Sequence, residues 1–219
     1  MKTPEQRKNE SENFIQKKHI AFLGSLPMLP ASNEVTVKSV DVICKRAVAS
    51  LLSTQISAEI RDNGAERIGF FVDLMKQFGV SDALNPQEKR LLEPNPTAQD
   101  ILNIEWEYEA YWSLVWALGL VEDITDGGTI CDCEKAIMLV AGVKSYDEFK
   151  SRCKLRDTEE IMDMLDLYYR YHWATVQHRA VDPKLPIGNL NEEIVMERRR
   201  GLQWLISEED DWFEIAMHT

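Results

Sequence analysis

One stretch of the chain decides the fold class: Tyr111-Trp112-Ser113-Leu114-Val115-Trp116-Ala117-Leu118-Gly119. It has no charged residue, and when it is wound into a helix no side of it is polar. A helix that is apolar all round must be enclosed by a large core or by a membrane. The apolar run, from Ala110 to Val121, is shorter than the roughly 20 residues that a membrane span needs. The stretch therefore predicts the central helix of a globular core.

Helix signals also dominate on the N-terminal side of this stretch. Thr97 is an N-cap residue, so the central helix is predicted to begin there. Ser39, followed by Asp41, gives a second N-cap signal. Earlier helices are predicted over Pro4 to Ala21, Val40 to Ile56, Ala58 to Phe78 and Pro86 to Leu92.

The segment from Ala58 to Phe78 is predicted to be one helix with a buried face. Its apolar and small residues recur every three or four positions, at Ile60, Gly64, Ile68, Phe71, Met75 and Phe78. Gly79 is expected to end the helix.

The C-terminal side is helical as well. Asp157 or Thr158 is predicted to start a long helix, and Ser145 a short one. The helices expected here are Asp132 to Ala141, a short one after Ser145, Thr158 to Ala180, Asn191 to Ile206 and a final turn. The segment most suited to extended structure is Val35 to Lys38.

These elements predict an all-α protein, a single irregular helical bundle with at most short extended or two-stranded pieces. At 219 residues the chain suits one domain. We divide residues 1–219 into an N-terminal helix with a Pro-rich connection (1–34), a core bundle (35–206) and an acidic C-terminal turn (207–219).

The charge of the chain limits its partners. A net charge of −12 repels phosphate backbones, so nucleic acid is not an expected partner. An acidic surface attracts a basic protein partner, although acidity also serves solubility alone. The sequence leaves the oligomeric state open.

The N-terminus and the cysteines bear on location and cofactors. Met1 to Lys18 has no apolar core of a signal peptide, so we expect a cytoplasmic protein with reduced thiols and no membrane contact. Cys131, Cys133 and Cys153 lack the paired spacing of a zinc site, so no metal and no cofactor is expected.

Three segments resemble a bacterial family, domain of unknown function 4272. They are Glu109 to Gly119, Glu160 to Ala174 and Glu197 to Leu205, and their order and spacing also fit. The resemblance extends from Arg7 and Ser11 to Asp211-Trp212 and Thr219. It implies an intracellular helical fold and supplies no activity or catalytic residue.

One set of polar residues is predicted to be buried. Asp166 shares a helix stripe with Met162, Tyr169 and Trp173, and Arg198 shares one with Ile194 and Leu202. Each buried charge needs an opposite partner. We therefore predict that Arg198 reaches Asp166, directly or through one bridging side chain.

Neighbouring charges would extend this pair into a candidate network. Its members are Asp163, Asp166, Arg170, Glu197 and Arg198. The network is interpreted either as a device that specifies the fold or as the lining of a functional pocket. His172 is expected to be packed and hydrogen-bonded, since no nucleophile motif accompanies it.

Two classes of function remain. The first is a non-catalytic interaction or regulatory protein, for instance of the immunity type, with an acidic surface. The second is an enzyme of unknown reaction that uses the Asp/Arg network in a helical pocket. A concave pocket that reaches the network favours the enzyme, and a sealed network favours the interaction protein.

Overall fold

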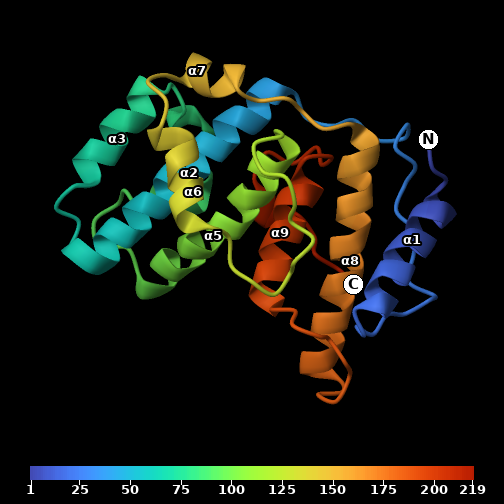
Figure 1. The fold of residues 1–219 in the computed structure, drawn as a ribbon. Helices are drawn as coiled ribbons and strands as arrows, with labels where there is room; N and C mark the ends of the chain where they lie inside the picture. The colour runs from blue at the N-terminus through green and yellow to red at the C-terminus, as the bar shows by residue number, and fades with distance from the viewer. The chain divides into compact units, whose positions relative to one another are not determined.

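The computed structural model describes residues 1–219, and well over half of them lie in helices. There is no strand or sheet, which confirms the all-α prediction (Figure 1). The helices are α1 (Pro4–Lys17), α2 (Val40–Asn63), α3 (Ile68–Gln77), α4 (Pro86–Arg90), α5 (Ala98–Ala117), α6 (Cys133–Ala141), α7 (Tyr146–Ser151), α8 (Thr158–Ala180) and α9 (Glu192–Trp204). Two short 3₁₀ turns are η1 (Ser81–Ala83) and η2 (Trp212–Glu214).

The helices begin where polar side chains cap them. Thr97, Ser39 and Ser145 each accept a hydrogen bond from a backbone N–H in the first turn of α5, α2 and α7. Asp157 and Asn191 are the N-caps of α8 and α9. These starts agree with the predictions because an N-cap is decided by a few adjacent residues.

The predicted break between the second and third helices was wrong. Helix α2 continues to Asn63, and Gly64 ends it in the left-handed conformation, with φ of 63°. Ala65 follows with φ of 73°, so the backbone turns before α3 begins. Gly64 is thus a C-cap and not part of a buried helix face, as we had expected from its spacing. Gly79, with φ of 65°, follows α3 as predicted.

Two further boundaries differ from the predictions. Val35 to Lys38 forms no strand, because no neighbouring segment pairs with its backbone. The one β-bridge joins Ile20 to Ile187. Helix α1 ends at Lys17 and not at Ala21, since His19 adopts a left-handed conformation with φ of 56°.

The helices form two compact units. The first unit comprises residues 1–37, 123–130 and 156–219, and in it α8 contacts α1 and α9. The second comprises residues 38–122 and 131–155, and in it α2 contacts α3, α5, α6 and α7. The division of the chain into one domain with two end segments stays a prediction.

The central helix is α5. Leu114, Val115 and Leu118 are fully buried, and Trp116 is 3% exposed, as the apolar stretch predicted. No helix of the protein is both long and apolar enough to cross a membrane.

Candidate ligand-binding pocket

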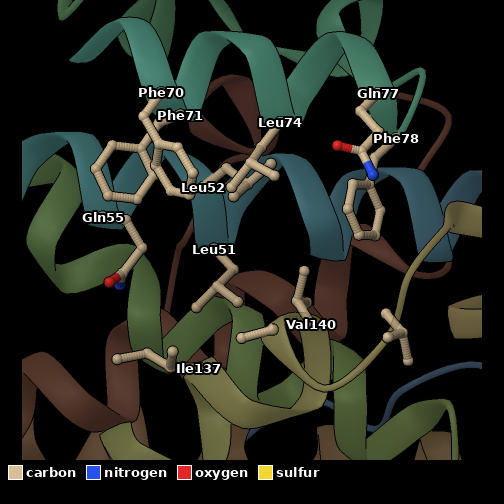
Figure 2. A pocket seen from close by; sticks show the side chains of 12 residues that line it. Leu51, Leu52, Gln55, Phe70, Phe71, Leu74, Gln77, Phe78, Ile137 and Val140 are labelled. Atoms are coloured by element: carbon tan, nitrogen blue, oxygen red, sulfur yellow. The ribbon is translucent and has the colours of Figure 1, made fainter. Parts of the chain in front are cut away.

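An apolar pocket of about 310 Å³ lies within the second unit, between α2, α3 and α6 (Figure 2). Its floor comes from α2, and its two walls come from α3 and from α6 with the residues that follow it. The lining side chains are Leu51, Leu52, Gln55, Phe70, Phe71, Leu74, Gln77, Phe78, Ile137, Val140, Ala141 and Val143.

Helical spacing explains how these residues come to face one another. Phe71 and Leu74 of α3 and Phe78, which caps this helix, lie three and four positions apart and therefore share one face. On α2, Leu51 and Gln55 lie four apart. The sequence pattern identified the apolar face of α3, but nothing in it indicated that part of this face borders a cavity.

Only two lining residues, Gln55 and Gln77, are polar. The amide nitrogen of Gln55 donates to the hydroxyl of Tyr108, and that of Gln77 donates to the carbonyl of Lys144 at 3.2 Å. Figure 2 shows the two amides on opposite sides of the view, with Leu51 and Leu52 between them. No titratable side chain lines the pocket.

None of the five predicted network residues lines this pocket; all lie in the first unit. Asp166 and Arg170 form an ion pair within α8. Arg170 donates from Nε and Nη2 to both carboxylate oxygens, at 2.9 and 2.8 Å, and each residue is 1% exposed. A third bond, of 3.3 Å, joins Arg170 to Glu12 of α1.

Asp163 belongs to a different set of charges. Arg7 of α1 donates to Asp163 at 3.0 Å and to Glu159 at 3.2 Å, and Lys2 reaches Asp163 at 2.6 Å. Arg7 is 1% exposed. Our network prediction did not include Arg7, although it shares the buried stripe of α1 with Ser11 and Ile15 at spacings of four, which was a usable signal.

The predicted pair between Arg198 and Asp166 was wrong. Arg198 is buried, as expected, but its guanidinium donates to the backbone carbonyls of Asp126 and Thr129 and to the hydroxyl of Tyr168. Glu197 pairs with Arg200 at 3.0 Å. The prediction failed because backbone carbonyl groups can also accept hydrogen bonds from a buried arginine. Those of the 123–130 segment, which is distant in sequence, lie beside Arg198.

The sequence reading missed a buried carboxyl cluster in the second unit. Glu107 is fully buried and accepts hydrogen bonds from Asn85 at 3.3 Å and from Ser50 at 3.4 Å. Glu88, 1% exposed, pairs with Arg46. Burial raises the pKa of Glu107 well above its usual range, and the charge of Glu88 raises it further. Both carboxyls lie under other side chains, so they contribute to packing and not to an open site.

His172 is packed and hydrogen-bonded, as expected. Its Nδ1 lies 2.6 Å from the guanidinium of Arg199. Burial and, second to it, the charge of Arg199 together lower the pKa of His172 to about 4. Arg199 also donates to the carbonyl of His218 at 2.8 Å. Nowhere in the structure do three or more His, Cys, Asp or Glu side chains come together as metal ligands.

The family described as domain of unknown function (DUF4272) matches residues 7–215. The chain belongs to the DUF4272 family. This match covers nearly the whole chain and confirms the resemblance found in its helices. No curated protein and no solved structure matches this DUF4272 chain. The DUF4272 description names no reaction, ligand or partner.

Proposed function

We propose that this protein is a non-catalytic binding protein that holds an apolar small molecule in the pocket between α2, α3 and α6. The composition of the lining is the observation that carries the proposal: none of the twelve side chains is titratable. General acid–base catalysis and nucleophilic catalysis both need such a group at the reacting atoms. A lining of apolar side chains and two amides favours binding alone.

The volume of the pocket limits the size of the ligand. At about 310 Å³, it lies at the lower end of the range of small-molecule sites. It is roughly twice the volume of a cavity of about 150 Å³ that accepts benzene. A two-ring aromatic molecule or a medium-length alkyl chain is therefore the appropriate size class.

The polarity of the lining limits the charge of the ligand. A carboxylate or an ammonium group would lose its hydration in the pocket without gaining an opposite charge. Since the nitrogen of Gln55 is used by Tyr108, its oxygen remains available to accept a hydrogen bond from a hydroxyl group of the ligand. The pocket thus suits a neutral molecule with one polar end.

The proposal includes an interaction or regulatory role for the protein as a whole. Its net charge of −12 favours a basic protein partner, which ligand binding would modulate. The four cysteines are all free thiols, which supports our placing it in the reducing cytoplasm.

The enzyme alternative has less support. It required a pocket that reaches the Asp/Arg network, whereas Asp166 and Arg170 are buried against one another and do not border the pocket of the second unit. In a network that specifies the fold, the charges are expected to be buried and paired in this way.

The test compares two probes with one alkyl chain, octan-1-ol and octanoate, by isothermal titration calorimetry on the full chain. We expect the alcohol to bind more tightly than the carboxylate by about tenfold or more, since the pocket offers no cation. Equal affinities, or binding of octanoate alone, would contradict the proposal.

Variants locate the binding site. Ala141→Trp fills the pocket from an exposed position on its lining and should weaken binding of octan-1-ol strongly. Met138→Trp is the matched control, since Met138 lies on the same segment, is 57% exposed and does not line the pocket. If both variants bind octan-1-ol as the unmodified chain does, the ligand is held elsewhere and the proposal fails.

A further inference from the structure

Two thiols meet at the start of α6, in the sequence Cys131-Asp132-Cys133. Their sulfur atoms lie 4.0 Å apart, and the sulfur of Cys133 also lies 3.6 Å from the carbonyl oxygen of Cys131. Both are reduced thiols. At this separation the sulfur atoms are in contact, so no other atom lies between them.

The backbone holds the two thiols in this arrangement. The N–H of Cys131 donates to the buried carboxylate of Glu109 in α5 at 2.7 Å. Asp132 is the N-cap of α6, and its side chain accepts a hydrogen bond from the N–H of Lys135 at 2.9 Å. Cys133 is the first residue of the helix. Both sulfur atoms therefore extend from backbone positions that hydrogen bonds fix.

The spacing of the two cysteines permits a disulfide. Two Cα atoms with one residue between them are about 7 Å apart when the backbone is fully extended. Asp132, with ψ of 93°, is less extended than that. The Cα atoms of the two cysteines are therefore closer than this limit, as a disulfide requires.

The two cysteines differ in their access to solvent. Cys133 is exposed, whereas Cys131 is 5% exposed. A dissolved reagent can therefore reach Cys133 and is largely excluded from Cys131. Reactive cysteines are at least partly exposed, while buried structural cysteines are inert. Contact with Cys133 is then the route by which Cys131 takes part in a reaction.

We propose that Cys131 and Cys133 form a thiol–disulfide exchange site, in which Cys133 attacks a low-molecular-weight disulfide and Cys131 resolves the product. Exchange with a dissolved disulfide needs one open sulfur to attack it and a second sulfur in contact with the first to release the mixed product. This pair supplies both. The inference does not rest on the pocket, because neither cysteine lines it.

The exchange proceeds in two steps. The thiolate sulfur of Cys133 attacks one sulfur of the dissolved disulfide, so that a mixed S–S bond forms and the other half leaves as a thiolate, which takes up the proton that Cys133 lost. The thiolate sulfur of Cys131 then attacks the sulfur of Cys133. The S–S bond between the two cysteines forms, the mixed bond breaks, and the second half leaves and takes up the proton of Cys131. The protein loses two electrons and two protons, and one disulfide becomes two thiols.

A third cysteine supplies the matched control. Cys153 is partly exposed, and its sulfur donates to the carbonyl oxygen of Phe149 at 3.3 Å. Cys153→Ser removes an accessible thiol and leaves the contact between Cys131 and Cys133 intact. It separates a reaction that depends on this contact from one that depends on access alone.

The experiment incubates the reduced full chain with oxidised glutathione, alkylates the remaining thiols and digests the protein without reduction, using a protease that cleaves before aspartate. Cleavage before Asp132 puts the two cysteines on separate peptides, residues 126–131 and 132–146. We expect mass spectrometry to find these peptides joined by a disulfide in the unmodified chain and in Cys153→Ser. Dithiothreitol should separate them.

Two variants assign the roles of the thiols. In Cys131→Ser, the mixed disulfide between glutathione and Cys133 should accumulate, because no neighbouring thiol displaces the glutathione. In Cys133→Ser, the thiol of Cys131 should be lost at least about tenfold more slowly than in the unmodified chain, because its sulfur is buried.

Two results would overturn the inference. One is the absence of the joined peptides from the folded chain after treatment with oxidised glutathione. The other is loss of the Cys131 thiol in Cys133→Ser at the rate seen in the unmodified chain. Circular dichroism checks that each variant is folded, and Cys131→Ala replaces Cys131→Ser if the buried hydroxyl prevents folding.

Discussion

Two buried arginines of the first unit, Arg170 and Arg199, differ in the groups that they contact. Arg170 is bound at both oxygens by the carboxylate of Asp166. Arg199 has no carboxylate partner: it contacts His172 and the carbonyl of His218, its guanidinium lies 4.7 Å from the ring centre of Tyr169, and its Nε has no hydrogen-bond partner. Burial lowers the pKa of Arg199 to about 10. The contribution of Arg170 to stability should therefore depend on its carboxylate partner, whereas the stability of the site around Arg199 should depend on whether His172 is protonated.

At Arg170 we predict that the stability of the protein depends strongly on the ion pair with Asp166. Arg170→Met should lower the free energy of unfolding by about 3–5 kcal/mol, because the buried carboxylate of Asp166 is left without its partner. The double change Asp166→Leu with Arg170→Met should recover much of this loss, since an apolar pair avoids the cost of desolvating two charges. Urea unfolding of the three proteins measures both effects.

The second partner of Arg170 provides the comparison. Glu12→Gln removes the weaker, 3.3 Å contact and should cost no more than about 1 kcal/mol. A double variant that is less stable than Arg170→Met would refute this account of the Asp166 pair.

At His172 we predict a stability that falls in mild acid. The folded pKa is about 4 against 6.5 for a free histidine, so the unfolded chain binds the proton more readily between these values. The stabilising contribution is complete above pH 6.5 and is lost progressively as the pH falls from 6.5 to 4. The shift corresponds to at most about 3 kcal/mol.

The measurement compares urea unfolding of the unmodified chain and His172→Gln from pH 4 to 7. Glutamine keeps an acceptor for Arg199 and does not titrate, so the difference in stability between the two proteins should change over this range. The carboxylates titrate in both proteins, and their effect cancels in the difference. A difference that is constant with pH would show that His172 titrates normally.

At the scale of helices, the connection between α2 and α3 depends on one residue. Gly64 ends α2 with φ of 63°, a conformation that costs residues with a Cβ roughly 1–2 kcal/mol. Because Gly64 has open space around its Cα, that backbone cost is the whole expected effect of substitution.

We predict that Gly64→Ala lowers the free energy of unfolding by about 1–2 kcal/mol. Gly69→Ala is the matched control, since Gly69 also has open space but lies inside α3 with an ordinary helical backbone. Gly69→Ala should raise the free energy of unfolding by up to about 0.5–1 kcal/mol, because alanine favours a helix more than glycine does. Thermal unfolding followed by circular dichroism measures both, and equal effects would rule out a requirement for the left-handed backbone at Gly64.

At the scale of the whole molecule, the path of the chain between the two units affects how cooperatively the protein unfolds. The chain leaves one unit and enters the other after residues 37, 122, 130 and 155, so neither unit is a continuous segment. Each unit needs segments that are far apart in sequence, and a partly folded chain would leave both incomplete. This connectivity favours unfolding in a single step.

We predict coincident transitions when unfolding is followed by tryptophan fluorescence and by far-ultraviolet circular dichroism. The probes report on both units, since Trp112 and Trp116 lie in the second unit and Trp204 and Trp212 in the first. Two separated transitions would show instead that the units unfold independently and that the single-domain prediction is wrong.

The sequence by itself determined that the fold is helical, where most of the helices begin and that α5 is buried. Caps such as Thr97 and Ser39 act within one turn, and the apolar stretch ending at Gly119 needs enclosure whatever surrounds it. The same local reasoning predicted that Asp166 is buried and that Arg170 lies beside it, because four residues of spacing put the two on one stripe of one helix.

Only the tertiary structure decided which distant groups meet. A partner for Arg198 on α8 was expected at Asp166, but the position of the 123–130 segment brings the carbonyls of Asp126 and Thr129 to its guanidinium. The pocket exists because α2, α3 and α6 leave a space between their apolar faces, and the residue pattern of any one helix does not predict such a space.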